Sequence, residues 1–177
     1  KELTRHINAQ GRFYALYCSL ETLKRISEAE QGIPRILDEL QNAVEEHGQF
    51  AHYSFAATLD PSKYTLVVRK ALSSLCTQLD KPLILFLDEI DCLSNGTLLT
   101  FLQQLRYGYI NRADTPFVHS MALVGMRNIR DYKGRIREDT ETLGSSSPFN
   151  IVSEALTLRN FTQEEIARLY AQHTEAT

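Results

Sequence analysis

The sequence predicts an α/β fold of three layers, in which helices cover both faces of a mainly parallel sheet. Continuous apolar runs alternate with segments whose apolar residues recur every three or four positions. The run at residues 83–87 leads directly into Asp88 and Glu89, and an unbroken run of this kind is typical of a strand buried on both faces. With 43% hydrophobic residues, the 177-residue chain is long enough for one domain, residues 1–177, with a sizeable core.

Three elements are predicted in the first third of the chain. Residues 2–10 form a helix, because Gly11 stands where a left-handed residue commonly closes one. Residues 13–19 are apolar and aromatic, which favours a strand. Apolar residues at helical spacing over 33–44 indicate an amphipathic helix that ends near Gly48.

Two helices flank the acid-ended strand. The first is predicted to begin at Asp60, a good N-cap, with Pro61 at its first position, and its apolar face continues to Leu79. The strand follows at residues 83–89. Apolar residues at helical spacing over 98–109 then predict the second helix.

The last third of the chain contains a third strand at residues 117–125 and a short fourth strand at 155–158. Between them, residues 127–148 show no hydrophobic period and are predicted to form a flexible loop. A capping box from Thr162 to Glu165 predicts that a helix starts there, within 162–177.

Asp88 and Glu89 are the main candidate functional residues. Open α/β sheets bind ligands at the carboxyl ends of their strands. In phosphate-transfer folds a first acid there holds Mg²⁺ and a second orients the attacking water. A buried strand that ends in a charged turn explains the same residues, and the spacing alone does not separate the two interpretations. Asp91 either orients its neighbours or is an acid at a helix N-terminus, favoured by the helix dipole, and the second interpretation is preferred.

Composition excludes several classes of function. A net charge of −3 argues against a general nucleic-acid-binding surface. The three cysteines have no metal-ligand spacing and fit a reducing compartment. No apolar run approaches the ~18 residues of a membrane span. We therefore expect a cytoplasmic protein without membrane or nucleic-acid partners.

The order of these elements resembles the P-loop NTPases of the AAA-like and STAND-like type. Residues 83–89 look like their Walker B strand, which implies that Asp88 binds the metal and that Glu89 is catalytic. Residues 122–128 look like the next strand, so Arg127 or Asn128 is implied as the sensor that contacts the γ-phosphate of ATP. Residues 156–166 are similar to the last core strand and the start of the lid helix.

The chain departs from this family in one respect. The phosphate-binding Gly-x-x-x-x-Gly-Lys-Ser/Thr loop is absent, and none of the eight glycines is followed by lysine. Residues 2–10 then correspond to the helix after that loop, and we expect the loop and its strand to lie upstream of Lys1; their loss is the alternative. ATP and Mg²⁺ binding and ATPase activity are expected in a full-length parent, and weak or absent binding in this chain.

The missing strand would be central, between the third and last strands. We expect residues 155–158 to close onto the third strand, a partner chain to supply the strand, or the last segment to pack differently or swap in a dimer or homo-oligomer. Two other classes of function remain. One is a non-catalytic regulatory or protein-interaction module on a degenerate NTPase fold, and the other is a Mg²⁺-dependent nuclease built on Asp88 and Glu89.

Overall fold

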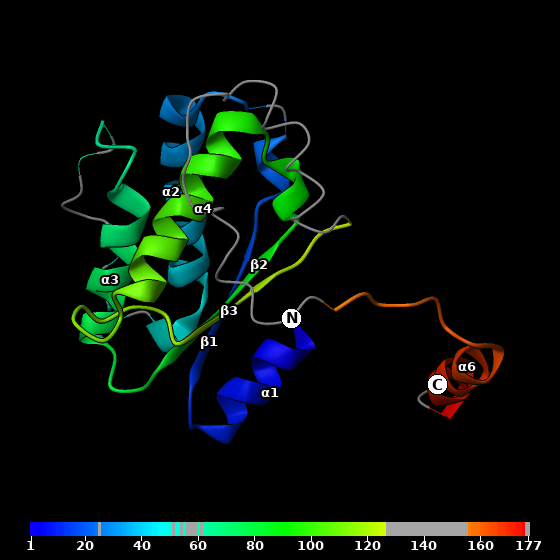
Figure 1. Ribbon diagram of the computed structural model, residues 1–177. Coiled ribbons are helices and arrows are strands. Elements are labelled where there is room, and N and C mark those ends of the chain that lie inside the picture. Colours follow the sequence, from blue (N-terminus) through cyan, green and yellow to red (C-terminus); the bar gives the residue numbers. More distant parts are fainter. Residues whose placement is uncertain are drawn as a thin grey trace.

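The computed structural model has an α/β fold whose sheet is parallel and has the strand order β1-β2-β3 (Figure 1). Five α-helices lie in the described part of the chain. The structure describes residues 1–24, 26–50, 52–53, 55, 60, 62–126 and 156–175. The elements are α1 (Glu2–Gln10), β1 (Tyr14–Ser19), η1 (Glu21–Leu23), α2 (Ala29–Glu46), η2 (Gly48–Phe50), α3 (Val67–Gln78), β2 (Leu83–Asp88), η3 (Ile90–Cys92), α4 (Asn95–Ile110), β3 (Ser120–Leu123) and α6 (Gln163–Glu175).

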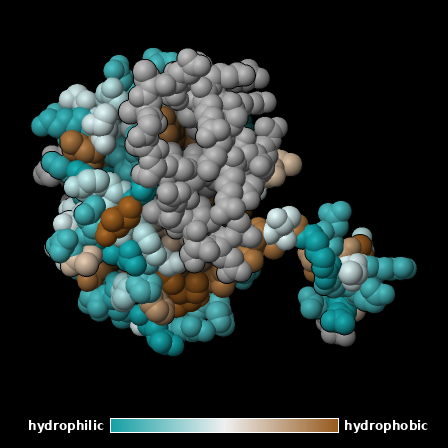
Figure 2. Space-filling view, in the orientation of Figure 1, coloured by the Kyte–Doolittle hydropathy of each residue, from teal (hydrophilic) through white to brown (hydrophobic). Residues whose placement is uncertain are grey.

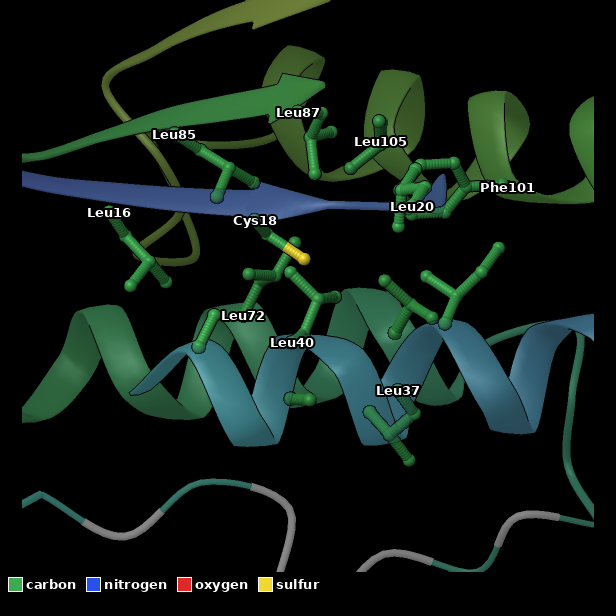
Figure 3. Packing of buried hydrophobic residues seen from close by; sticks show 14 of the residues in the cluster. Leu16, Cys18, Leu20, Leu37, Leu40, Leu72, Leu85, Leu87, Phe101 and Leu105 are labelled. Atoms are coloured by element: carbon green, nitrogen blue, oxygen red, sulfur yellow. The ribbon is translucent and has the colours of Figure 1, made fainter. Parts of the chain in front are cut away.

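The core lies between the sheet and the helices α2, α3 and α4. Along β2 the side chains alternate, and Leu83, Leu85 and Leu87 are buried. Figure 3 shows the leucines of β1 and β2 pointing toward apolar side chains of these three helices. Because each fully buried leucine contributes about 1.5–3 kcal/mol, this alternation fixes which face of the strand turns inward.

Helix α1 lies on the opposite side of the sheet and contacts β1 (Figure 1). Gly11 closes α1 with a φ of 70°, as the sequence predicts. The side-chain amide of Asn8 then bonds the backbone of β1 twice: Nδ2 donates to the Ala15 carbonyl at 2.9 Å, and Oδ1 accepts from the Ala15 amide at 2.7 Å. Asn8 thereby satisfies peptide groups of an edge strand.

Helix α3 begins at Val67, so the predicted start at Asp60 is wrong; Pro61 lies outside the described residues. The Asp60 carboxylate instead accepts hydrogen bonds from the amide and hydroxyl of Ser62, which lower its pKa. The first amides of α3 are capped by Gln104, whose Oε1 accepts from Val68 at 3.0 Å and from Arg69 at 3.3 Å. A buried side chain of α4 thus sets the start of α3.

The C-terminal part differs from prediction in two places. Strand β3 is shorter than the expected 117–125, and residues 156–158 are exposed and form no strand, although residue 155 is outside the described part. The predicted loop at 127–148 also lies outside it. The capping box is confirmed, because the Glu165 amide donates to Thr162 Oγ1 at 3.3 Å and the Thr162 amide to Glu165 Oε2 at 2.8 Å.

Where Figure 2 colours the body by hydropathy, its surface is mainly hydrophilic, with separate apolar patches. Helix α6 stands apart from the body in Figures 1 and 2. Its apolar side chains Ile166, Leu169 and Tyr170 are 42%, 57% and 71% exposed. None of the helices in the part of the chain that the structure describes is both long and apolar enough to cross a membrane.

The contact between α2 and α4 predicts a destabilising substitution at Gly32. A methyl group at residue 32 would overlap the side chain of Thr97, which is fully buried and short. We expect Gly32→Ala to cost about 1–3 kcal/mol through overpacking, of which better helix propensity offsets up to about 1 kcal/mol. Urea unfolding measures the loss. Gly48→Ala is the control, because its methyl group meets no atom within 4 Å. Equal stability losses in the two variants would contradict the close contact.

Candidate functional site

The carboxylates of Asp88, Glu89 and Asp91 form an acidic turn at the carboxyl end of β2. Backbone hydrogen bonds fix this turn from both neighbouring strands. On the β1 side, the Leu20 amide donates to the Asp88 carbonyl at 3.0 Å. On the β3 side, the Val124 carbonyl accepts from the Ile90 amide, also at 3.0 Å. The acidic turn therefore has a defined position at the edge where parallel sheets bind ligands.

Asp88 is half-buried, and both of its oxygens accept hydrogen bonds. The hydroxyl of Tyr17 donates to Oδ2 at 2.7 Å, and the Glu89 amide donates to Oδ1 at 3.0 Å. Burial raises the pKa of Tyr17 from its usual 10.0 to about 12, and the hydrogen bond to Asp88 adds to the increase. The Lys1 ammonium lies 5.3 Å from the centroid of the Tyr17 ring. Tyr17 thus lies between the N-terminal end of α1 and Asp88.

Glu89 has a left-handed backbone, with φ 57° and ψ 36°. It is the single non-glycine residue with positive φ in the described part of the chain. This conformation costs about 1–3 kcal/mol and often occurs at functional sites. The Cys92 thiol donates to Glu89 Oε2 at 3.7 Å, and burial first, then the Glu89 charge, raises the pKa of that thiol.

Asp91 lies in the first turn of η3, a helix of three residues, so its predicted place at a helix N-terminus is confirmed and its helix-dipole role stays a prediction. Its Oδ1 atom is buried and has no hydrogen-bond partner among the described residues. Gly125, just after β3, allows this close approach, because a methyl group there would lie 2.7 Å from Asp91 Oδ1. An unpaired buried carboxylate oxygen is costly, which makes it a point where a cation or a donor would be favoured.

Of the residues singled out from the sequence, the structure brings Asp88 and Glu89 to one edge of the sheet. Arg127 and Asn128 lie outside the described residues. Within those residues, no group of three or more His, Cys, Asp or Glu side chains is arranged to hold a metal ion. Tyr17 is not among the residues predicted from the sequence, because its contact with Asp88 follows from the register of β1 and β2.

Comparison of the chain with protein-family models, with curated proteins and with solved structures gave no match.

The backbone of Glu89 predicts that glycine is better tolerated there than alanine. Glycine removes about 1–2 kcal/mol of strain, while its extra freedom in the unfolded chain costs about 0.4–1 kcal/mol. We expect Glu89→Gly to be more stable than Glu89→Ala by about 1 kcal/mol in urea unfolding. At the exposed helical residue Glu45 the order should reverse, because alanine is the better helix former. The same order at both positions would rule out strain at Glu89.

The contact between Tyr17 and Asp88 predicts how the phenol titrates. Since the neutral phenol is favoured in the folded state, the stability that this provides is present below pH 10.0 and is lost as the pH rises toward about 12. Absorbance titration of the wild type should show a phenolate signal near pH 12 that is absent from the titration of Tyr17→Phe. In Asp88→Asn the pKa of Tyr17 should fall but stay above 10.0, because burial still raises it. Loss of a signal near pH 10 would contradict the contact.

Proposed function

We propose that the acidic turn is the Mg²⁺-binding and water-activating edge of an ATP-binding and ATP-hydrolysing domain of the AAA-like type. One observation carries the proposal: the N-terminal end of α1 and the Asp88 carboxylate lie on the same side of the sheet, joined through Tyr17. The first amides of a helix have no partner within it and attract phosphate. A phosphate group bound beside Tyr17 would meet the helix amides on one side and a metal-binding carboxylate on the other.

The chain has acids that could bind Mg²⁺, but it lacks the loop that would bind a triphosphate. Mg²⁺ takes one or two carboxylates and keeps several waters. The half-buried Asp88 carboxylate would supply one such ligand. The glycine loop that cradles phosphates is not in the sequence. The proposal therefore requires this loop to come from a longer form of the chain or from another subunit.

Each residue has a separate role in the proposed reaction. Asp88 holds the metal, and Tyr17 keeps the carboxylate in position through its 2.7 Å hydrogen bond. Glu89, at the left-handed residue that follows β2, accepts a hydrogen bond from the water that attacks the γ-phosphate. Mg²⁺, when bound, neutralises charge on the phosphates. The alternative function, a non-catalytic interaction module, is favoured by the missing glycine loop and predicts no turnover under any condition.

Glu89→Gln is the direct test of this function. The test uses a longer form of the chain, or a complex with another subunit, that contains the phosphate loop. In that protein the substitution should lower kcat for ATP hydrolysis by about 10²–10⁴. The affinity for MgATP should stay nearly unchanged, because only the water contact is lost. Steady-state kinetics and calorimetry measure the two quantities. Asp38→Asn, an equivalent change at an exposed position of α2, is the control.

Two results would contradict the proposal. Undiminished hydrolysis in Glu89→Gln would remove Glu89 from the reaction. Absence of ATP hydrolysis in the wild-type protein that contains the phosphate loop would favour the interaction module. For the 177-residue chain alone, we expect MgATP to bind no more tightly than about 0.1 mM in calorimetry, because the phosphate cradle is incomplete.

A further inference from the structure

A second candidate site lies at the opposite end of the sheet from the acidic turn, where β2 begins. An open surface pocket of about 410 Å³ is present there, and we refer to it as the basic pocket. Lys81, Arg112 and His119 line it together with apolar residues that include Pro82 and Phe117. Its volume falls within the range of small-molecule sites.

An aromatic ring accompanies each of the three basic side chains. The Lys81 ammonium lies 5.3 Å from the ring centroid of Tyr14, and the Arg112 guanidinium lies 3.8 Å from that of Tyr109. The ring of His119 lies 5.6 Å from the ring of Phe13. Side chains that are already oriented lose less conformational freedom when a ligand binds.

The Arg112 guanidinium is also held by a hydrogen bond. Its Nη1 donates to the Tyr109 carbonyl at 2.6 Å, and this bond fixes the planar group at the end of α4. The guanidinium keeps further N–H donors, which suit the oxygens of an anion.

Of the described residues that line the basic pocket, none is acidic. Within the described residues, neither Lys81 nor Arg112 forms an ion pair with a carboxylate. The nearest acids in sequence lie outside this lining: Asp80 accepts a hydrogen bond from the Tyr14 hydroxyl at 2.9 Å, and Asp114 lines a neighbouring pocket. This concentration of positive charge contrasts with the net charge of −3 for the chain. Unpaired cations around a cavity attract anions.

We propose that the basic pocket binds the phosphate group of a small phosphorylated molecule. The guanidinium fork of Arg112 and the Lys81 ammonium bind the phosphate oxygens, and His119 adds a third donor. The wall formed by Pro82 and Phe117 contacts the apolar part of the molecule. Phe117 keeps its place because it packs directly on Gly108 of α4, where a methyl group would overlap its ring. The site is independent of the acidic turn.

Binding of phenyl phosphate tests this proposal, with benzoate as the carboxylate that carries the same ring. NMR titration of the 177-residue chain should show saturable shifts at residues 81–83 and 117–119. Arg112→Gln and Lys81→Met should each weaken phenyl phosphate binding about tenfold, since each removes a charge-assisted contact. Arg69→Gln is the matched control, because Arg69 stacks on Tyr107 in the same way outside the pocket.

The proposal requires phenyl phosphate to bind several-fold more tightly than benzoate and Arg69→Gln to keep wild-type affinity. Equal affinity for the two probes would overturn the assignment to phosphate. Equal losses in Arg112→Gln and Arg69→Gln would show a general effect of surface charge and overturn the site. Absence of saturable shifts in the wild type would do the same. Circular dichroism of each variant tests whether it is folded. Because Arg112 is exposed, we expect Arg112→Gln to fold like the wild type.

Discussion

The parallel pairing of β1 with β2 is the contact on which the rest of the structure depends. Its register runs from Tyr14 opposite Leu83 to Ser19 opposite Asp88. A shift by one residue would turn the leucines of β2 away from α2, α3 and α4 and would expose them. The same register sets Tyr17 beside Asp88. One ladder of hydrogen bonds thus determines both the core and the environment of the acid that we propose as the metal ligand.

The sequence predicts those features that depend on local pattern. The strand β2, with acids at its end, and the amphipathic α2 follow from runs and periods of apolar residues. The start of α3 does not, because its cap is Gln104, 36 residues away from Val68 in the chain. The role of Tyr17 requires the strand register, and the left-handed backbone of Glu89 requires the path of the turn. Arg127 and Asn128 keep the status of predictions, as does the resemblance to P-loop NTPases.

Opposite charges occupy the two ends of β2. The strand is six residues long, and at about 3.3 Å per residue Asp88 and Lys81 lie on the order of 20 Å apart. This separation exceeds the distance of about 8 Å over which exposed charges interact in physiological salt. Neither end neutralises the other. The acidic turn therefore keeps its attraction for a cation, and the basic pocket keeps its attraction for an anion.

The amide of Asn8 has a consequence for association between molecules. At Ala15 it occupies the peptide groups that an incoming strand would need, so the β1 side of the sheet is closed to extension there. The far side of β3 pairs with no strand in the part of the chain that the structure describes. A strand from a second copy that added to the β1 side would leave its own peptide groups opposite Ala15 without partners. Edge-to-edge contact between two copies is therefore disfavoured at this point of β1.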